Sequence, residues 1–466
     1  MSRWFCLFLV LSIWFIPSFA KRVFGGFDFQ QIVFFGVMPG ATDGTDWEVY
    51  FLFFKWVVVR PLILTVIIYC LYRLLKLLFG AKWRERKKLN WAIIAVLGVF
   101  GVDEVLRSVG YYTYLERAYS EDKTAQYFKA VSDIDLAAKS SKNLILIYVE
   151  SLENTYSEPK FFGTNLNEPI ENLLGKSGYR MQQVSGTHWS IAGQVASQCG
   201  IPLATFLLNA VGAYTDKMLG NITCLGDILN AAGYHQTFLV GSNVKHSGLS
   251  SFYSTHGYDE VLGKYELESH HAEQERTGWG EGLQDDTLMD VALDIALKQS
   301  KSDQPFNITV ELTDNHAANG ILSPRCRNKG LGEQLYEVIY CTNETLAKFI
   351  NALDNTSILD DTVLVILGDH LFMGDFDKNL DGFERSIYFN YLAHDKFNSK
   401  KSGKISHFDV YPTLLSLVAG YNLPTLHLGI NLSTPDSNEK QRMHDYVFGP
   451  EYNPNAPFFK KFWDVK

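Results

Sequence analysis

The amino-acid sequence predicts an α/β fold, a mostly parallel sheet flanked by helices, preceded by an N-terminal helical membrane region. An apolar first quarter is followed by a remainder of ordinary soluble composition, in a chain of 466 residues. The remainder contains four aliphatic runs of strand length with helical patterns between them. Strands and helices that alternate at this spacing predict a parallel sheet with helices on both faces.

Three segments within residues 1–107 are apolar enough to be membrane spans, near residues 4–20, 61–80 and 89–105. The first ends in Ser18-Phe19-Ala20, which also resembles a signal-peptidase site. A basic cluster follows the second: Lys82, Arg84, Arg86, Lys87 and Lys88. Basic residues favour the cytoplasmic side, so we expect the second span to return inward. The third segment is short for a membrane span. If it crosses the membrane, everything after Asp103 lies outside the cytoplasm; if it does not, the large domain is cytosolic.

Four of the six cysteines lie in the soluble part and form two closely spaced pairs. The predicted disulfides are Cys199–Cys224 and Cys326–Cys341. Paired cysteines are typical of an oxidising compartment, although four buried thiols are the alternative. The formal net charge of −9 and the lack of a basic stripe in the soluble sequence exclude a nucleic-acid-binding protein.

The soluble part divides into a linker (residues 108–132), one large domain (133–437) and a C-terminal extension (438–466). Within the domain, buried strands are predicted at Asn143–Glu150, His235–Gly241, Pro305–Leu312 and Thr362–Asp369. Helical patterns are predicted at residues 224–233, 285–300 and 344–355. We expect the linker to run along the membrane.

Two of the predicted strands end in residues that can bind a metal ion. One ends in Glu150 and the other in the pair Asp369-His370. In open α/β sheets, ligands collect at the carboxyl ends of the strands. Carboxylate oxygens with one imidazole suit Zn²⁺ or Mn²⁺. The alternative is that these are helix-capping or solvated turn residues.

In the segment "SGTHWSIAGQVASQCGIP" (Ser185–Pro202), the hydroxyls of Thr187 and Ser190 stand one helical turn apart just before a run of small residues. Helical spacing predicts a helix that begins near Ser190. Ser190 is then either an N-cap or part of an anion site at the helix N-terminus, where a small residue such as Gly193 lets an anion approach. The local sequence is compatible with both.

Several motifs occur together and in a characteristic order: "YVESLENTY", "GTHWSIAGQVASQCGIPL", "CLGDILNAAGY", "STHGYDEVLG", "DDTLMD", "TDNHAANG", "LGDHLFM" and "HFDVYPTLLSL". They resemble those of the membrane-anchored glucan phosphoglycerol transferases and lipoteichoic acid synthases, in the alkaline-phosphatase and sulfatase superfamily. The likeness covers about Asn143 to Gly429. It implies a sulfatase-like sheet and a membrane-anchored enzyme.

The resemblance also implies roles for individual residues. Glu150, Asp369 and His370 become ligands of one divalent ion, Mn²⁺ or Zn²⁺ or else Mg²⁺, and a hydroxyl nucleophile completes the shell. Ser190 stands ten positions before Gly200, the spacing of sulfatase nucleophiles.

Thr187 is the alternative nucleophile, because the related transferases generally use threonine. The resemblance places His316 on the phosphate or leaving group and Lys245 near the head-group, although both residue types are more often structural or solvated. His256 and His407 match superfamily positions.

The function implied is transfer of phosphoglycerol from phosphatidylglycerol to a periplasmic glucan or similar glycan through a covalent Ser/Thr intermediate. The protein would be a multi-pass protein of the bacterial inner membrane with its catalytic domain in the periplasm. The alternatives are phosphoethanolamine transfer to a lipid or glycan, and a binding or sensor protein without catalysis. A sulfatase activity is disfavoured, because "IAGQ" follows Ser190 where sulfatases have Cys/Ser-x-Pro-x-Arg.

Overall fold

The fold comes from a computed structural model of the whole chain. It describes residues 3–24, 28–38, 42, 47–80, 87–131, 142–206, 216–268, 282–316, 319–326, 330–374, 376, 380, 382–393, 396–397 and 403–463. These residues form two compact units. The first contains most of the N-terminal helices; the second contains residues 33–44 and nearly all of the chain from Arg117 onward.

The first unit has three helices long and apolar enough to cross a membrane, within residues 3–21, 49–79 and 88–108. They belong to α1 (Arg3–Phe24), α4 (Arg60–Phe79) and α5 (Lys87–Ser108), and α3 (Trp47–Phe53) and the π-helix η1 (Phe54–Val59) lead into α4. The second apolar helix therefore begins at Val49, twelve residues before the predicted start at residue 61. The third is longer than the predicted one. Lys82, Arg84 and Arg86 of the predicted basic cluster lie outside the described residues.

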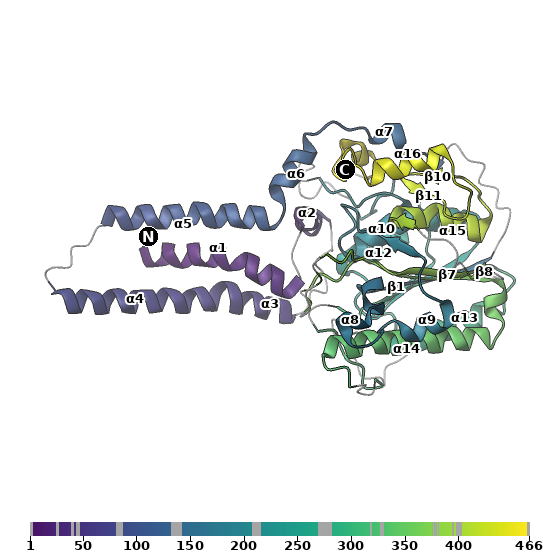
Figure 1. Cartoon of the computed structure of the whole chain (residues 1–466), viewed down its shortest axis with the longest axis horizontal. Coiled ribbons are helices and arrows are strands. Elements are labelled where there is room, and N and C mark those ends of the chain that lie inside the picture. Colours follow the sequence, from purple (N-terminus) through teal and green to yellow (C-terminus); the bar gives the residue numbers. More distant parts are fainter. Residues whose placement is uncertain are drawn as a thin grey trace. The chain divides into compact units, whose positions relative to one another are not determined.

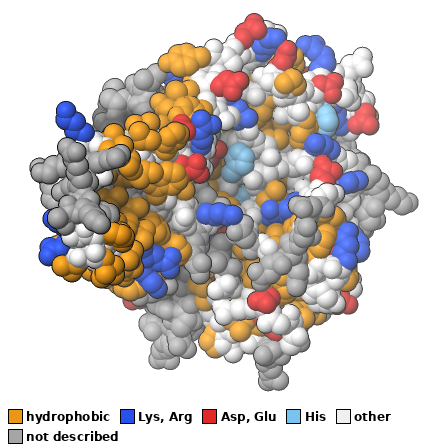
Figure 2. Space-filling model, turned by 60° about the vertical axis from the view of Figure 1, so that its left-hand side comes forward, with side chains coloured by type: hydrophobic (Ala, Val, Ile, Leu, Met, Phe, Trp, Pro, Cys, Tyr) orange, Lys and Arg blue, Asp and Glu red, His pale blue; other side chains and the backbone are white. Residues whose placement is uncertain are grey.

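Within this unit, α1 lies between α4 and α5 and contacts both (Figure 1). The indole nitrogen of Trp14 donates to the carbonyl of Leu97 at 3.0 Å, and a side chain at Gly101 would collide with the Trp14 ring. The outer faces are apolar, and Figure 2 shows hydrophobic side chains gathered over one side of the molecule. Val99 is 70% exposed and Leu78 is 69% exposed. Surfaces of this kind suit contact with lipid.

A seven-stranded sheet with the order β4-β3-β5-β1-β6-β7-β8 forms the centre of the second unit. Its strands are β1 (Asn143–Val149), β3 (His235–Val240), β4 (Glu260–Leu262), β5 (Phe306–Leu312), β6 (Thr362–Gly368), β7 (Phe389–Ala393) and β8 (Lys396–Phe397). The first five in spatial order are parallel, whereas β7 and β8 are antiparallel to their neighbours. The four predicted strands are confirmed as β1, β3, β5 and β6.

Helices cover both faces of this sheet (Figure 1), as the fold prediction requires. Ile145 and Ile147 of β1 pack toward α9 (Glu168–Leu174), α13 (Asp285–Gln299) and α14 (Gln334–Asp354). Leu144 and Leu146, which point to the opposite face, pack toward α11 (Leu225–Ala231) and α15 (Val410–Ala419). Because β1 is buried on both faces, its sequence is a continuous apolar run.

The remaining elements of the second unit are short. They are α8 (Pro159–Phe162), α10 (Ser190–Cys199), α12 (Leu249–Thr255), α16 (Asn438–Val447), the small sheets β2 (Tyr179–Met181) with β9 (Gly403–Ile405) and β10 (Thr425–Leu426) with β11 (Gly429–Ile430), and the 3₁₀-helices η4 (Asn154–Ser157), η5 (His246–Gly248), η7 (Ile358–Asp361), η8 (His407–Asp409) and η9 (Pro457–Phe462). Further N-terminal helices are α2 (Phe29–Val37), α6 (Tyr111–Ala118) and α7 (Thr124–Tyr127).

Part of the predicted linker packs on the second unit. Thr124 is fully buried and bonds Tyr446, and the Phe128 ring stacks on His427 with centroids 4.7 Å apart. These buried and stacked side chains hold residues 124–128 within the second unit. The predicted boundary at residues 132–133 lies outside the described residues, so the domain limits remain predictions.

Candidate metal and nucleophile site

The predicted metal-binding residues lie together at the carboxyl ends of two adjacent strands. Glu150 follows β1, and Asp369 and His370 follow β6, which pairs with β1 in parallel. The three are at most 4% exposed. His370 Nε2 lies 3.4 Å from Glu150 Oε1 and 3.4 Å from Asp369 Oδ2. The three residues form a cluster whose candidate ligand atoms all lie within 4.8 Å of one another.

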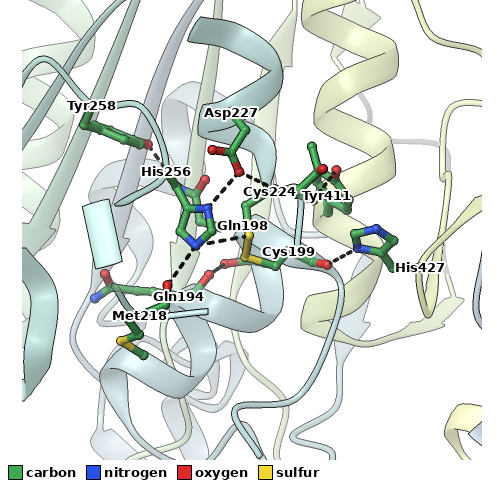
Figure 3. Close-up of a disulfide and its surroundings, with 12 residues drawn as sticks. Gln194, Gln198, Cys199, Met218, Cys224, Asp227, His256, Tyr258, Tyr411 and His427 are labelled. Carbon is green, nitrogen blue, oxygen red and sulfur yellow. Dashed lines mark hydrogen bonds and ion pairs between the residues drawn. A yellow bond between two sulfur atoms is a disulfide. The ribbon is translucent and has the colours of Figure 1, made fainter. Parts of the chain in front are cut away.

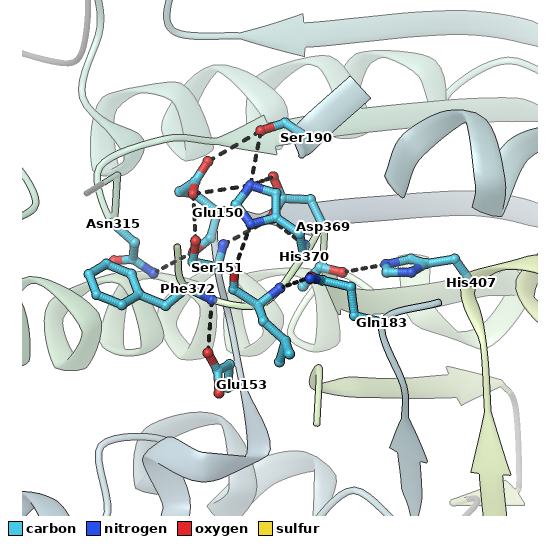
Figure 4. Close-up of polar contacts among 12 residues, drawn as sticks. Glu150, Ser151, Glu153, Gln183, Ser190, Asn315, Asp369, His370, Phe372 and His407 are labelled. Atoms are coloured by element: carbon cyan, nitrogen blue, oxygen red, sulfur yellow. Dashed lines mark hydrogen bonds and ion pairs between the residues drawn. The ribbon is translucent and has the colours of Figure 1, made fainter. Parts of the chain in front are cut away.

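Ser190 is the hydroxyl that joins this cluster (Figure 4). Its Oγ lies 3.4 Å from Glu150 Oε2 and 3.4 Å from His370 Nε2. The helix α10 begins at Ser190, and Trp189 occupies the N-cap position. Ser190 is therefore the first helical residue instead of the N-cap, and its hydroxyl points to the acidic cluster.

Gly193 allows α10 to approach the cluster. A Cβ atom added at this position would lie 2.0 Å from the carbonyl oxygen of Asp369. The sequence-based expectation was that a small residue here would admit an anion. In the structure the missing side chain makes room for the backbone of Asp369, a predicted ligand, so Gly193 sets the spacing between α10 and Asp369.

The His370 ring is oriented by the backbone that follows it. Its Nδ1 lies 2.8 Å from the carbonyl oxygen of Leu371, a geometry that assigns the proton to Nδ1. The Leu371 amide in turn donates to Gln183 Oε1 at 2.6 Å. With Nδ1 donating, Nε2 is left facing Glu150 and Ser190 with its lone pair available for a metal ion.

Asp369 provides the observation that tests whether these residues suit a metal ion. Its Oδ1 accepts from the amides of Ser151 at 2.8 Å and His370 at 2.9 Å. Its Oδ2 is buried and has no hydrogen-bond partner among the described residues. A buried carboxylate oxygen without a hydrogen bond is costly unless a positive charge stands beside it. Two carboxylates, one imidazole and one hydroxyl are a donor set that fits Zn²⁺ or Mn²⁺.

The ionisable groups of the cluster shift one another's pKa values. Burial raises the pKa of Glu150, but its interactions with the imidazoles of His370 and His316 and the hydrogen bonds from Ser151 and Ser190 together outweigh burial, and the net shift is downward. Burial and the charge of Glu150 raise the pKa of Asp369 to about 6. Burial lowers the pKa of His370, but the two carboxylates outweigh it and the net shift is upward. Protons therefore compete with a cation for this site.

The other predicted site residues, Thr187, His316 and Lys245, lie in different surroundings. Thr187 is fully buried, and its Oγ1 donates to the carbonyl of Val184 at 2.8 Å. His316 follows β5, is half-buried and interacts electrostatically with Glu150. Lys245 is exposed and lies just before η5. Of the two hydroxyls left open by the sequence, Ser190 is the one that lies with the predicted ligands.

Several residues of the site were not singled out from the sequence. Ser151, in the left-handed conformation with φ 54°, turns the chain after Glu150 so that its amide reaches Asp369. Asn315 donates to the carbonyl of Glu150 at 3.3 Å. Both lie inside the quoted motifs "YVESLENTY" and "TDNHAANG", but Ser151 acts through its backbone amide and Asn315 through a bond to a backbone carbonyl, and neither contact leaves a pattern in the sequence.

Both predicted cysteine pairs lie at disulfide distance, Cys199 with Cys224 and Cys326 with Cys341. The first joins the last residue of α10 to the residue before α11 (Figure 3). His256 Nδ1 lies 2.7 Å from Asp227 Oδ2 beside this bond. The disulfide therefore fixes the end of α10 opposite Ser190.

His407, the other superfamily histidine, is buried and hydrogen-bonds the carbonyl of Gly368 through Nε2 at 3.1 Å. Burial lowers the pKa of its imidazole to about 4. A neutral ring donating to a carbonyl supports the strand end that leads to Asp369, which is a structural role.

Comparison with known proteins gives a family and a fold. The sequence profile of the sulfatase family matches residues 142–421. The chain is 34% identical over 357 residues to phosphoglycerol transferase I of Shigella flexneri, covering 74% of this chain and 45% of that protein. It is 33% identical over 365 residues to the enzyme of the same name from Escherichia coli O127:H6, covering 75% and 46%. The chain thus spans about half the length of these curated relatives.

Among solved structures, a Vibrio parahaemolyticus protein of the alkaline phosphatase superfamily superposes with a TM-score of 0.50 at 21% identity, covering 70% of this chain and 78% of that one. This likeness concerns the fold, and it agrees with the mostly parallel sheet covered by helices.

Proposed function

The chain belongs to the sulfatase family, and we propose that it is a membrane-anchored, metal-dependent transferase that moves phosphoglycerol from phosphatidylglycerol to a periplasmic glucan or a similar glycan. One observation carries the proposal: the Ser190 hydroxyl lies 3.4 Å from both a carboxylate and an imidazole of the buried cluster. The similarity to phosphoglycerol transferase I supports the choice of head-group. The three apolar helices support a membrane anchor.

Glu150, Asp369, His370 and Ser190 would hold the divalent ion. When bound, a divalent ion lowers the pKa of an oxygen nucleophile by many units and stabilises negative charge on a phosphoryl group. The chain itself contributes a rigid, buried set of donors, because each carboxylate is also hydrogen-bonded by neighbouring groups.

In the first step, the Ser190 Oγ loses its proton and attacks the phosphorus of phosphatidylglycerol. A bond forms between Oγ and phosphorus, the bond from phosphorus to the diacylglycerol oxygen breaks, and diacylglycerol leaves with a proton. The N-terminal end of α10 favours the negative phosphate here, since the first amides of a helix have no intrahelical acceptor. The product is a phosphoglycerol ester of Ser190.

His316 and Lys245 would act on the substrate. We assign His316 to the phosphate or the leaving oxygen, because it follows β5, the strand that pairs in parallel with β1 and so ends beside Glu150. We assign Lys245, which is exposed at the end of the loop after β3, to the head-group. In the second step a sugar hydroxyl attacks phosphorus, Ser190 Oγ leaves and regains a proton, and the glycan carries the phosphoglycerol.

The experiment is a turnover assay with the full chain in detergent, phosphatidylglycerol, Mn²⁺ or Zn²⁺, and a glucan acceptor. We expect diacylglycerol release that stops on chelation and resumes when the metal is returned. Ser190→Ala should abolish release. Thr187→Ala is the control variant and should retain release if it folds, because its hydroxyl bonds only the Val184 carbonyl among described groups.

The outcomes discriminate between the possible head-groups, nucleophiles and functions. Release with phosphatidylethanolamine but not with phosphatidylglycerol would replace the head-group assigned here. Release in Ser190→Ala that is lost in Thr187→Ala would transfer the nucleophile to Thr187. A folded, metal-loaded protein that releases nothing from either lipid would favour a binding or sensor protein.

A further inference from the structure

We propose that Glu153 and Arg385 are positioning residues that fix the two chain segments bearing the metal ligands relative to each other. The proposal rests on the proposed metal site. Glu153 belongs to the motif "YVESLENTY", in which only Glu150 was given a role from sequence. Arg385 lies in the segment between β6 and β7 and had no predicted role.

Glu153 is a fully buried carboxylate with several donors around it. Thr155 Oγ1 donates to its Oε2 at 2.7 Å, and the amide of Phe372 donates to its Oε1 at 2.8 Å. Arg385 donates to Oε2 through Nε at 3.0 Å and to Oε1 through Nη2. Two parallel bonds of this kind make a bidentate pair, which fixes geometry as well as charge.

Arg385 also reaches the backbone that follows the metal ligands. Its Nη2 donates to the carbonyl of Phe372 at 2.8 Å. The amide and the carbonyl of Phe372 are thus both held by the pair, the amide by Glu153 and the carbonyl by Arg385. The Arg385 side chain is 27% exposed, and its guanidinium lies 5.0 Å from the Phe376 ring centroid.

The two clamped segments are those that carry the ligands. Glu153 follows Glu150 by three positions, and Phe372 follows His370 by two. Figure 4 shows Glu153 below Phe372, on the side away from Ser190. Between these points the segments are bonded again, since the Ser151 amide donates to Asp369 Oδ1 at 2.8 Å.

This arrangement has a consequence for the His370 ring. The ring donates to the carbonyl of Leu371, so the direction of Nε2 depends on the backbone from His370 to Phe372. Glu153 and Arg385 hold the far end of that backbone. Groups that orient metal ligands in this way typically change metal affinity 10- to 100-fold when they are removed.

A pair with only a structural role would affect folding but not the affinity of the folded protein for metal. A buried ion pair is in general weak evidence for stabilisation, so stability alone cannot identify the role. The informative quantity is the metal dissociation constant of the folded protein, with the conservative variant Arg385→Lys, which keeps the charge and loses the planar fork.

The experiment uses the full chain in detergent, stripped of metal by chelation and then titrated with Mn²⁺ and Zn²⁺ against a competing chelator dye. The variants are Glu153→Gln, Arg385→Ala and Arg385→Lys. Arg180→Ala is the matched control, because Arg180 pairs with Glu384 at 3.8 Å on the surface and is 71% exposed. Circular dichroism at the titration temperature identifies the folded variants.

We expect Arg385→Ala and Glu153→Gln to weaken metal binding at least about tenfold, and Arg385→Lys to do so less, while Arg180→Ala leaves it within twofold. The double variant Glu153→Gln with Arg385→Ala should lose no more metal affinity than Arg385→Ala alone, because the two residues act as one unit. If Arg385→Ala does not fold, Arg385→Lys decides. If folded Arg385→Lys and folded Glu153→Gln bind metal as tightly as the parent protein, the positioning role is wrong and the proposed function is unaffected. If the parent protein itself binds no metal, the proposed function is wrong.

Discussion

Substitution of Gly193 by alanine tests whether α10 is held against the metal-ligand segment as the structure shows. In an open helix, alanine is more favourable than glycine by about 1 kcal/mol, so helix propensity alone predicts a more stable protein. At Gly193 the added Cβ would lie 2.0 Å from the carbonyl oxygen of Asp369, 2.9 Å from its carbonyl carbon and 3.4 Å from its Cα. These atoms are backbone, so they cannot move aside as a side chain does.

The size of the effect follows from these distances. Real Cβ atoms essentially never approach another heavy atom closer than 3.0 Å, so either α10 or the Asp369 segment must move by at least 1.0 Å, the difference between 3.0 and 2.0 Å. Overpacking of this kind costs about 1–3 kcal/mol, and because the clash is with backbone atoms we expect the upper part of this range, which exceeds the helix gain. A displacement of about 1 Å between reacting groups can lower the rate about 100-fold.

The assay measures thermal unfolding and diacylglycerol release for Gly193→Ala beside Gly36→Ala. Gly36 lies in α2, and among the described residues nothing stands within 4 Å of its added Cβ. We expect the control to be neutral or slightly stabilised and fully active. Gly193→Ala should be less stable and about 100-fold less active. A Gly193→Ala protein as stable and active as the control would refute the close packing of α10, at Gly193, against the Asp369 backbone.

Three further predictions follow from the site, the disulfide and the membrane helices. The metal affinity should fall as the pH drops through about 6, because cation binding needs a deprotonated Asp369, whose pKa is about 6, and a neutral His370, whose pKa is raised. A metal affinity that is unchanged between about pH 5 and pH 8 would contradict this prediction. Replacing Cys199 and Cys224 by serine should lower the free energy of unfolding by about 3 kcal/mol, because the disulfide closes a loop of 25 residues. Denaturant titration measures this, and an unchanged unfolding midpoint would contradict the prediction. A reporter enzyme fused after Lys466 should be active only if it works outside the cytoplasm, and cytoplasmic activity would mean that α5 does not cross the membrane.

The parts of the fold that follow from burial were predictable. A strand buried on both faces must be apolar throughout, so β1 and β6 could be recognised as continuous aliphatic runs without any partner being known. The positions of the proposed ligands Glu150 and Asp369 followed from the rule that functional groups gather where parallel strands end. Ser190 was harder to place, because a hydroxyl at a helix start serves equally well as a cap.

The parts that depend on contacts between distant segments were not predictable. Gly193 was expected to make room for a ligand, but it makes room for the Asp369 carbonyl, and no local pattern distinguishes the two. Arg385 lies 232 residues from Glu153 in the chain, so no local sequence spacing predicts its bond to that carboxylate. The packing of Phe128 on His427 is of the same kind, which is why residues near it were interpreted as a linker.

The central claim is that Ser190 carries the phosphoglycerol group between the two half-reactions. The measurement that tests it most directly is the intact mass of the full chain after incubation with phosphatidylglycerol and Mn²⁺ in the absence of an acceptor, with peptide mapping of the modified residue. We predict one phosphoglycerol adduct on Ser190, which is absent in Ser190→Ala and after chelation and is removed when an acceptor glycan is added. An adduct that persists in Ser190→Ala, or diacylglycerol release by a protein whose mass never changes under these conditions, would contradict it.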